Sequence, residues 1–465
     1  MTDYIDHAYR SIFAIPLADK VLLYAPIHNL TALVNTASTK SLQASLLSGQ
    51  PSPVEPLSGI AQELHSAVDV PQPRQGDFVP TFLGILPTRG CNFSCRYCGF
   101  LASEDVHTVM QLDTARDAVN WYMDQVDQAG KSAAEIHFFG GEPFCAEEIL
   151  DFTVNLARVR SEATGCDLRF EVATNGAFNE ARCHWAADHL HTIVLSLDGP
   201  AEIQNCYRPY KDGRGSFETV VRNAHILAES PAELFLRACV TAETVDRMDA
   251  IAAWFCEEIR PAGICFEPLQ PTLPAVGRRL EPPDPWAFAR GFIRAVEVMA
   301  SYGVQPVHAA ADIATRRVTF CPVGDDVAIV APDGTVVACY LLRREWEVRG
   351  MDLRLGRIVG GDVQLDAGAV AAARAINVHN KPLCQRCFCR WHCAGGCHVN
   401  HVATERAGPY DGLCVQTRVI TLWNILQALE QADVGRAWLD DWAAVERAVR
   451  QPSDRLVDLD LETWA

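Results

Sequence analysis

The middle of the chain repeats one pattern: a short apolar run, a polar loop, and a longer stretch with apolar residues every three or four positions. Short runs of this kind are typical of buried strands, and the longer stretches, such as residues 112–128 and 217–228, have the spacing of amphipathic helices. Six candidate strands are found, at residues 82–86, 135–139, 168–173, 192–197, 234–240 and 263–268. Strands that alternate with helices form a parallel sheet covered by helices. Because six units are too few to close an eight-stranded barrel, we expect an open, partial (β/α)6 barrel with ligands at the carboxyl ends of its strands.

The amino-terminal segment departs from this alternation. Residues 12–17 and 21–25 predict a hairpin around residues 18–20, followed by short helical patterns. Pro-rich stretches at residues 50–53 and 71–73 are typical of linkers. We therefore expect a small α+β extension over residues 1–80, separate from a barrel over residues 81–305.

The carboxy-terminal third also breaks the pattern. A hairpin at residues 326–331 and 336–339, with a turn at Pro332-Asp333-Gly334, leads into a Cys-dense stretch. Residues 415–449 predict two helices whose apolar faces pack into a core. The residues expected in that core are Trp423, Leu426, Leu429, Trp438 and Trp442. These patterns predict a Cys-rich domain over residues 306–420 and C-terminal helices over residues 421–465.

Composition limits the function classes. A chain of 465 residues with 49% hydrophobic residues can bury a sizeable core. The net charge of −18 disfavours nucleic acid as a partner. The amino terminus lacks the pattern of a signal peptide, and no run of 18 apolar residues predicts a membrane span. We expect a protein of the reducing cytoplasm, with no nucleic acid or membrane as partner.

Cysteine is the most informative residue type, because 18 thiols without a secretory signal favour metal ligands or core residues over disulfides. Some of them cluster, and the others are scattered singly. A single buried thiol behaves as a small hydrophobic side chain, and we expect this of the scattered ones. They are Cys145, Cys166, Cys183, Cys206, Cys239, Cys256 and Cys265.

Three thiols follow the first barrel strand with the spacing C-x3-C-x2-C: Cys91, Cys95 and Cys98. Three thiolates on one loop can hold three corners of a cubane cluster and leave one iron open. Structural zinc would need four ligands. The spacing, with Tyr97 directly before the third thiol, resembles the radical SAM superfamily and its partial, TIM-like barrel. That resemblance implies a 4Fe–4S cluster whose open iron chelates S-adenosylmethionine, which is cleaved to methionine and a 5′-deoxyadenosyl radical.

Further motifs lie in register with this family, each at the end of a predicted strand. Gly140-Gly141-Glu142-Pro143 matches the stretch that holds the methionine amino group, and glycines allow the backbone to approach a ligand closely. By the same resemblance, the other cofactor-binding residues are Tyr97, Asn175, the ribose-contacting Ser196, the carboxylate-binding Arg208 and Leu269 beside the adenine. An arginine suits a carboxylate because it can donate two parallel hydrogen bonds. Relatives often show His-Asp ahead of that arginine, where this chain has Gln204-Asn205.

The carboxy-terminal thiols form a seven-Cys pattern that resembles a SPASM domain with two auxiliary iron–sulfur clusters. By that resemblance, one 4Fe–4S cluster is held by Cys384, Cys387, Cys393 and Cys414, and the other by Cys321, Cys339 and Cys397. The second set is one thiolate short, because Thr315 stands where relatives carry another Cys. Either the site is open, so that substrate can bind iron, or a residue such as Asp312 completes it, or the cluster is smaller. We favour the open site.

Four residues near this pattern are expected to stay outside the clusters. Cys389 does not fit the seven-Cys spacing and is interpreted as a bystander. Histidines can ligate iron, but solvent-facing or helix-packing roles are expected for His392, His398 and His401.

The resemblance implies an oxidoreductase that acts on peptides or proteins, with the substrate electron leaving through the auxiliary clusters and a reductant such as flavodoxin or ferredoxin supplying the first electron. Anaerobic sulfatase maturases carry an Asp after the Cys that Cys339 matches, where this chain has Tyr340. We therefore favour a maturase of ribosomally made peptides that installs a thioether or carbon–carbon crosslink. Formylglycine formation is the alternative. Residues 1–80 are either a leader-binding module or a plain packing extension.

Other questions stay open at this stage. An iron–sulfur electron carrier or a zinc-scaffolded binding protein would explain the thiols alone, but neither needs the strand-end motifs. The catalytic base is not identified by the sequence. Tyr340, Cys206 and Asp312 are candidates by location only.

Overall fold

The computed structural model describes residues 11–17, 19–50, 55–100, 108–270, 279–399, 410, 412–450 and 455–460. These residues divide into two compact units. The first unit contains the described residues of 1–73, 309–321 and 376–465, and the second contains those of 74–308 and 322–375. The predicted turn position Ala18, most of the first predicted linker and His401 lie outside the described residues. The four-part division expected from the sequence stays a prediction.

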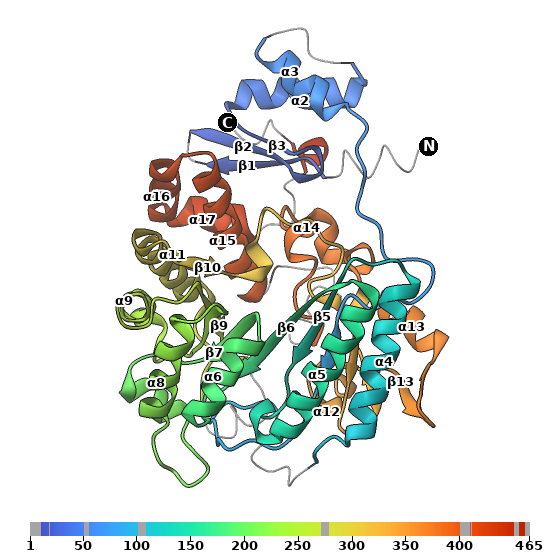
Figure 1. Cartoon of the computed structure of the whole chain (residues 1–465). Coiled ribbons are helices and arrows are strands. Elements are labelled where there is room, and N and C mark those ends of the chain that lie inside the picture. The colour runs from blue at the N-terminus through green and yellow to red at the C-terminus, as the bar shows by residue number, and fades with distance from the viewer. Residues whose placement is uncertain are drawn as a thin grey trace. The chain divides into compact units, whose positions relative to one another are not determined.

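The second unit is built on a sheet whose central strands are all parallel (Figure 1). Six of its strands match the predicted ones: β4 (Leu83–Ile85), β5 (Ala133–Phe138), β6 (Asp167–Thr174), β7 (Thr192–Ser196), β8 (Glu233–Val240) and β9 (Gly263–Pro268). They pair in chain order from β4 to β9. The helices of this part are α4 (Leu112–Gln128), α5 (Glu147–Thr164), α6 (Glu180–His189), α7 (Ala201–Tyr207), α8 (Phe217–Ala228), α9 (Met248–Glu258) and α11 (Pro285–Tyr302). The predicted open, partial barrel is confirmed.

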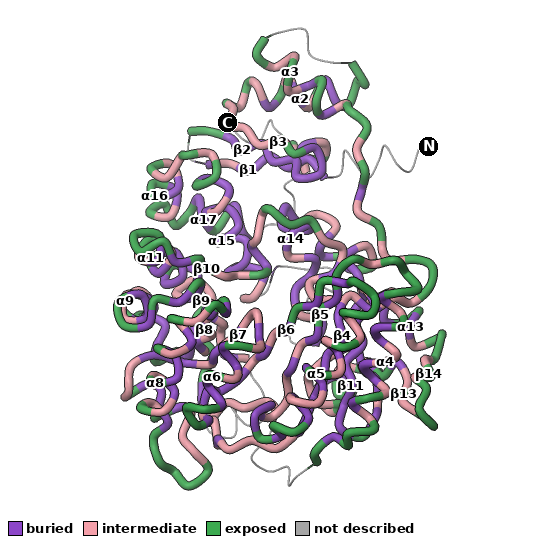
Figure 2. Tube along the Cα trace, viewed as in Figure 1, coloured by how far each residue is buried: buried purple, intermediate pink, exposed green. Residues whose placement is uncertain are grey.

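Side chains alternate between the two faces of these strands, so that buried and half-buried residues follow one another (Figure 2). Phe170 and Val172 of β6 are buried, and the guanidinium of Arg158 on α5 lies 5.9 Å from the ring centre of Phe170. The buried positions therefore face the helices. The half-buried positions between them, such as Glu171 and Arg237, lie on the opposite face, which we call the inner face.

The sheet continues beyond the predicted barrel on both sides. Strand β10 (Gln305–Val307) pairs in parallel with β9, and β11 (Ala328–Val330) pairs in parallel with β4. The predicted hairpin after residue 325 is formed by β11 and β12 (Thr335–Val337), and Gly334 has the left-handed φ of 79° that its turn requires. Strands β13 (Arg354–Val359) and β14 (Asp362–Leu365) add antiparallel pairs, and helices α12 (Arg343–Glu347) and α13 (Ala367–Arg374) complete this part.

The amino-terminal part of the first unit is a small antiparallel sheet with two helices. Strands β1 (Phe13–Leu17) and β2 (Lys20–Ala25) form the predicted hairpin, and β3 (Leu30–Val34), which was not predicted, pairs with β2. Helices α2 (Thr36–Ser48) and α3 (Leu57–Leu64) follow. Their shared core includes Leu23, Leu42 and Leu64 together with Leu456 from the end of the chain.

The tail of the first unit differs from its prediction of two helices. Beside the short α14 (Arg390–Cys393), the structure has α15 (Gly412–Ala428), α16 (Ala432–Asp440) and α17 (Trp442–Arg450). Glu430 adopts a left-handed φ of 57°, which ends the first tail helix early. Trp423, Leu426 and Trp438 are buried as expected and Leu429 is half-buried.

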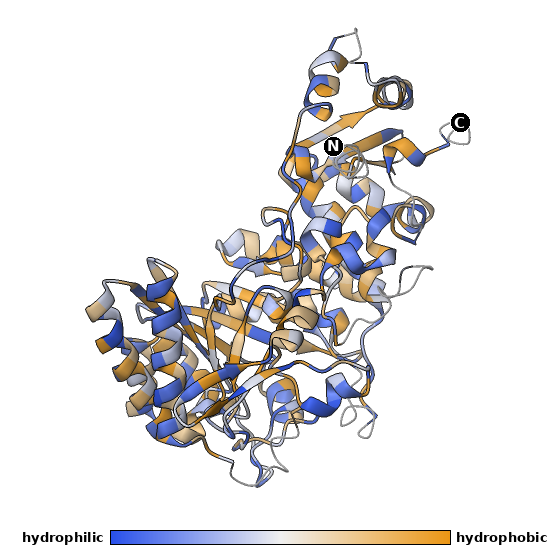
Figure 3. Cartoon of the chain, turned by 90° about the vertical axis from the view of Figure 1, so that its right-hand side faces the viewer, coloured by the Kyte–Doolittle hydropathy of each residue, from blue (hydrophilic) through white to orange (hydrophobic). Residues whose placement is uncertain are grey.

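Trp442 was wrongly expected in the core, because it is 39% exposed. It occupies the first position of α17, outside the apolar face that Ala444, Val445, Ala448 and Val449 form. Hydrophobic and hydrophilic positions alternate along the helices (Figure 3). Within the described residues, every helix is too short or too polar to cross a membrane.

Candidate active site and cluster pocket

The loop that carries Cys91, Cys95 and Cys98 follows β4, and all three thiols are half-buried. The chain just after α7 holds this loop by backbone hydrogen bonds. The Ser94 N–H donates to the Pro209 carbonyl at 2.9 Å, and the Arg96 N–H donates to the Tyr207 carbonyl at 2.9 Å. The cysteine loop is thereby fastened to the segment that carries Arg208.

Two glycines after β5 bring a second loop against the cysteine loop. A Cβ on Gly140 would lie 2.5 Å from the Thr88 carbonyl oxygen, and one on Gly141 would lie 2.1 Å from that of Gly90. The close approach expected of these glycines is made to the protein's own backbone. The Gly141 N–H donates to Thr88 at 3.1 Å, and the Glu142 N–H donates to Gly90 at 2.9 Å.

Glu142 is buried at the junction of these loops and accepts three hydrogen bonds. Its carboxylate accepts from the Thr174 hydroxyl at 2.7 Å, the Asn175 N–H at 2.6 Å and the Phe144 N–H at 3.1 Å. Burial raises the pKa of Glu142 to about 7, although these hydrogen bonds favour the carboxylate. Pro143 begins the short 3-10 turn that follows.

Asn175 connects this junction to the cysteine loop. Its side-chain amide donates to Asn92 Oδ1 at 2.7 Å and lies 3.6 Å from Cys91 Sγ. The predicted cofactor residues Glu142 and Asn175 therefore meet at the first of the three thiols. Two further residues were predicted to bind the cofactor. Ser196 is half-buried at the end of β7, and Leu269 follows β9 and is 4% exposed.

Arg208 lies in a polar network with Tyr97 and Asp198. Its Nη1 donates to the Tyr97 hydroxyl at 2.8 Å, and that hydroxyl donates to Asp198 Oδ2 at 2.5 Å. Asp198, which was not predicted, is fully buried, and burial raises its pKa despite the nearby arginine. Arg208 Nε is buried without a hydrogen-bond partner among the described residues. A free donor on a half-buried guanidinium suits the carboxylate of S-adenosylmethionine.

Gln204 and Asn205, which replace the His-Asp of relatives, have structural contacts. The Gln204 side chain accepts from the Asp198 N–H at 3.0 Å and donates to the Ser216 hydroxyl at 3.0 Å. Asn205 Oδ1 accepts from the Phe217 N–H at 2.9 Å. Both residues therefore brace the segment that positions Arg208.

The thiol chemistry also fits an iron–sulfur cluster. Burial raises the pKa of the Cys95 thiol to about 11, against the opposing effect of Arg208, so the thiol is neutral without a metal. Iron would supply the positive charge that three half-buried thiolates need. The residues present therefore fit both the cluster and its ligand.

The inner face of the sheet beside these loops is polar. Arg237 of β8 and Glu267 of β9 form an ion pair whose side chains are 39% and 46% exposed. Cys239 and Cys265 lie half-buried on the same two strands, and the Cys239 N–H donates to Asp198 Oδ1 at 3.1 Å. This pair could not be predicted from the sequence, because a charge inside a strand pattern is more often solvent-facing.

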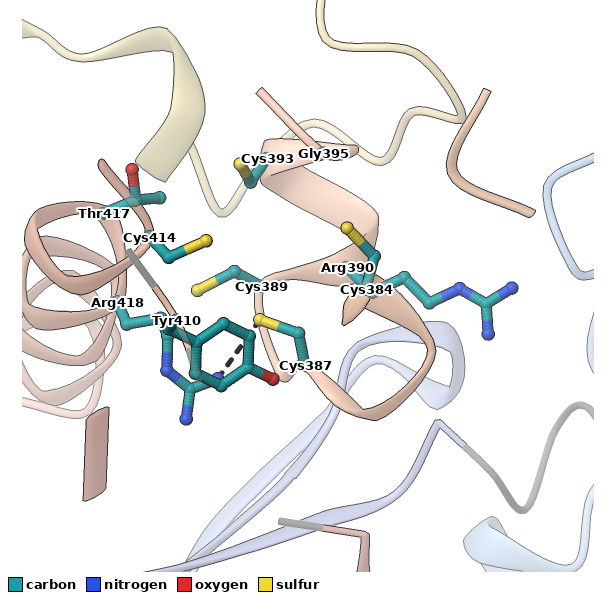
Figure 4. A pocket seen from close by; sticks show the side chains of 10 residues that line it. All are labelled: Cys384, Cys387, Cys389, Arg390, Cys393, Gly395, Tyr410, Cys414, Thr417 and Arg418. Carbon is teal, nitrogen blue, oxygen red and sulfur yellow. Dashed lines mark hydrogen bonds between the residues drawn. The ribbon is translucent and has the colours of Figure 1, made fainter. Parts of the chain in front are cut away.

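Four of the predicted carboxy-terminal ligands surround one cavity in the first unit (Figure 4). The residues Cys384, Cys387, Cys393 and Cys414 line this cavity. Cys389 lines it too. No three His, Cys, Asp or Glu side chains of the described residues are arranged to hold a single metal ion. Thiolates around one cavity are the ligands that hold iron–sulfur clusters.

The other predicted ligand set falls on both units. Cys339 belongs to the second unit, whereas Cys321 and Cys397 belong to the first, so their common cluster stays a prediction. Asp312, the possible fourth ligand, accepts hydrogen bonds from the Ala314 N–H at 3.0 Å and from Arg317 at 3.3 Å. The Thr315 carbonyl accepts from His392 at 3.1 Å.

The remaining candidates have varied surroundings. His392 is buried and hydrogen-bonded to Tyr24, and His398 is buried. Cys206 is exposed and accepts a hydrogen bond from Arg96 at 3.3 Å. Of the scattered thiols, Cys166, Cys183 and Cys256 are buried as expected. The expectation was wrong for Cys145 and Cys206, which are exposed because both lie at loop or short-helix positions.

Comparison with known proteins assigns the family of the central region. Residues 85–254 match the radical SAM superfamily. The serine-type anaerobic sulfatase-maturating enzyme of Klebsiella aerogenes is 28% identical over 338 residues, which cover 68% of this chain and 79% of that protein. The cysteine-type anaerobic sulfatase-maturating enzyme of Clostridium perfringens (strain 13 / Type A) is 28% identical over 184 residues, 38% of this chain and 49% of that protein.

Solved structures share the fold. Native anSMEcpe with bound AdoMet and Kp18Cys peptide has a TM-score of 0.60 at 18% identity, covering 75% of this chain and 99% of that one. Streptococcus suis SuiB bound to S-adenosylmethionine has a TM-score of 0.50 at 14% identity, covering 84% of this chain and 95% of that one.

A partial α/β barrel with three thiols beyond its first strand, beside a half-buried arginine, is an arrangement that suits an iron–sulfur barrel enzyme. The chain contains a radical SAM domain over residues 85–254, and the protein is an enzyme. This family implies S-adenosylmethionine and a 4Fe–4S cluster as cofactors.

Proposed function

We propose that the protein is a peptide maturase that installs an oxidative crosslink, a thioether or a carbon–carbon bond, in a ribosomally made peptide. The observation that carries the proposal is the attachment of the three-thiol loop to the Arg208 segment, next to a polar inner face. When bound, the cluster supplies the electron that cleaves S-adenosylmethionine to methionine and a 5′-deoxyadenosyl radical.

The chain's own residues hold and orient these groups. Cys91, Cys95 and Cys98 ligate three irons of the cluster. Arg208 binds the carboxylate of S-adenosylmethionine through its free Nε, and Tyr97 and Asp198 fix the guanidinium in place. The Gly140–Pro143 stretch and Asn175 bind around the amino group, Ser196 the ribose, and Leu269 the adenine.

The inner face offers a site for a peptide. Arg237 and Glu267 can each form an ion pair or hydrogen bond with a charged or amide group, and both are partly exposed. A peptide is bound in one structure of the same fold, anSMEcpe with its Kp18Cys peptide. The similarity to sulfatase-maturating enzymes makes formylglycine formation the second candidate. The replacement of an acidic residue by Tyr340 after Cys339 favours the crosslink instead.

Two auxiliary clusters would accept the electron that the substrate loses. The cavity lined by Cys384, Cys387, Cys393 and Cys414 supports the first of them. Cys321, Cys339 and Cys397 would hold the second, with an open iron or with Asp312 as its fourth ligand. A flavodoxin or ferredoxin would reduce the radical SAM cluster.

We further propose that the amino-terminal sheet binds a leader peptide by strand addition. The sheet order is β1-β2-β3, and Phe13 of β1 forms a bridge with Arg455 at its outer side. Within the described residues, the outer edge of β3 has no strand beside it, and all five of its residues are half-buried. An unpaired edge offers N–H and carbonyl groups to an incoming strand.

The test gives the anaerobically reconstituted protein dithionite, S-adenosylmethionine and the short peptides encoded beside its gene. We expect 5′-deoxyadenosine and a peptide that has lost two hydrogen atoms and does not react with a hydrazine that traps aldehydes. A trapped aldehyde would support formylglycine formation. Peptides that keep their mass while deoxyadenosine accumulates would contradict the proposed maturase.

A further inference from the structure

A fully buried arginine faces the thiol cavity of the first unit. Arg418 of α15 is 1% exposed, and its Nη1 donates a hydrogen bond to Cys387 Sγ at 3.1 Å. Figure 4 shows this hydrogen bond as a dashed line at the edge of the cavity. The guanidinium therefore touches a sulfur that we assign to an auxiliary cluster.

The other contacts of Arg418 fix the direction of its guanidinium. Nε donates to the Val449 carbonyl at 2.9 Å and Nη2 donates to the Ala448 carbonyl at 2.8 Å, both in the last turn of α17. The rings of Phe388 and Tyr410 each lie 4.2 Å from its central carbon. Two aromatic faces and two helix carbonyls stabilise the cation. The third nitrogen, Nη1, donates to the thiol.

Hydrogen bonds to sulfur ligands are one of the factors that set the reduction potential of an iron–sulfur cluster. A positive charge in a buried site favours the state with more negative charge, which is the reduced cluster. This effect is strong here because water is excluded from the guanidinium.

We propose that Arg418 is a positioning residue that raises the reduction potential of the auxiliary cluster held by Cys384, Cys387, Cys393 and Cys414. The proposal rests on the proposed function, in which this cluster takes one electron from the oxidised substrate. Arg418 makes that electron transfer favourable by donating its hydrogen bond to the Cys387 sulfur.

The chain offers a matched control in Arg390. It is also buried, at 2% exposure, and lines the same cavity. Its guanidinium points away from the sulfurs in Figure 4, with Nη2 3.4 Å from His379 Nδ1 and its carbon 4.5 Å from the Trp391 ring centre. Removing either arginine removes a buried cation, whereas the hydrogen bond to Cys387 Sγ belongs to Arg418.

The test is a redox titration of the reconstituted full chain, followed by electron paramagnetic resonance, for wild type and Arg418→Met, Arg418→Lys and Arg390→Met. At a fixed applied potential we expect Arg418→Met to lower the ratio of reduced to oxidised auxiliary cluster about tenfold, which equals about 59 mV for one electron. Arg418→Lys keeps the charge but not the planar donor and should give a smaller shift in the same direction. Arg390→Met removes a buried charge near Cys384 but no hydrogen bond to Cys387, and it should give a smaller shift than Arg418→Met.

An unchanged potential in Arg418→Met with full iron content would overturn the proposal, as would an equal shift in Arg390→Met. If Arg418→Met loses the cluster, an unchanged potential in Arg418→Lys overturns it instead. Wild-type protein that cleaves S-adenosylmethionine but holds only about four irons would overturn this proposal and leave radical SAM chemistry standing. If the variants show the expected redox shifts but the protein does not cleave S-adenosylmethionine, the result would contradict the proposed function alone.

Discussion

The hydroxyl of Tyr340 lies on the inner face of the sheet. A Cβ on Gly84 of β4 would lie 2.8 Å from it, and the ring of Phe139 is 4.7 Å from the tyrosine ring. The hydroxyl is buried and has no hydrogen-bond partner among the described residues. Burial also raises the pKa of Tyr340 well above its usual value, so it remains a neutral donor. A buried hydroxyl without a hydrogen-bond partner lowers the stability of the folded protein, unless a bound substrate supplies the partner.

We therefore expect Tyr340→Phe to keep or raise the melting temperature, since it removes an unsatisfied group without leaving a cavity. Cleavage of S-adenosylmethionine without peptide should be unchanged, whereas the rate of peptide modification should fall about tenfold because the substrate loses one hydrogen bond. Thermal unfolding, deoxyadenosine formation and product mass measure the three effects. Unchanged peptide modification would show that the hydroxyl does not contact the substrate.

His308 illustrates a buried base at the residue scale. It follows β10 and packs edge-on against Phe288 and Phe292, with ring centres 6.3 and 5.3 Å away. Burial lowers the pKa of His308 from 6.5 to about 4. Between these values the unfolded chain binds the proton and the folded chain does not, so stability is lost as the pH falls through this window.

We expect His308→Phe to reduce that pH dependence. The free energy of unfolding, measured in urea at several pH values between 4.5 and 7, should fall less steeply towards acid in the variant than in wild type. The two slopes should differ by an amount that corresponds to the uptake of up to one proton on unfolding. Equal slopes in the two proteins would mean that His308 titrates normally when folded.

Single residues also mark the limit of sequence-based prediction. The cysteine loop and Arg208 could be identified because their spacing is itself the signal. Arg418 could not, because a helical arginine gives no sign that Phe388, Tyr410 and a thiol surround it. Likewise, only the fold reveals that Cys389 lines the cavity of its neighbours.

At the scale of elements, two strand-end loops meet with almost no space between them. A Cβ on Gly141 would clash with the backbone of the cysteine loop, and a backbone cannot move aside as a flexible side chain can. We expect Gly141→Ala to displace that loop, lower the iron content of the radical SAM site and abolish deoxyadenosine formation. Gly90→Ala is the matched control, because its Cβ would meet only the Thr88 side chain at 3.4 Å. Full activity in Gly141→Ala would show that the loops need not touch.

The free edge of β3 allows a test of leader binding without truncation. Deleting the segment would expose the core around Leu42 and Leu456, so hydrogen exchange is the cleaner measurement. We expect amides of Leu30–Val34 to gain protection when a leader-bearing peptide is added, and not when the same peptide lacks its leader. The amides of β1 should not change. Protection confined to other elements would contradict strand addition at β3.

Element prediction succeeded where patterns were long and failed where they were short. The six barrel strands and α4 could be predicted because their periodicity is strong. Strands β10 and β14 have three and four residues, and their pairing partners are set by the fold. The tail was predicted as two helices because the sequence does not indicate that Glu430 adopts a left-handed φ.

At the scale of the whole molecule, thiols are grouped in both units. The second unit carries the radical SAM loop on its sheet, and the first holds the five-thiol cavity together with the amino-terminal sheet. The sequence resemblance predicted the radical SAM loop and four of the five cavity thiols, but not Cys389. It did not predict that β11 to β14 extend the barrel sheet, because only long-range pairing reveals this.

The central claim is that this chain uses its three-thiol loop to cleave S-adenosylmethionine. The most direct measurement is anaerobic reconstitution, with iron and sulfide counted per chain and 5′-deoxyadenosine followed after addition of dithionite and S-adenosylmethionine. We predict about twelve irons per chain, as three four-iron clusters require, with deoxyadenosine formed by wild type and not by Cys95→Ala. Zinc in place of iron, or deoxyadenosine formed equally by Cys95→Ala, would contradict the account.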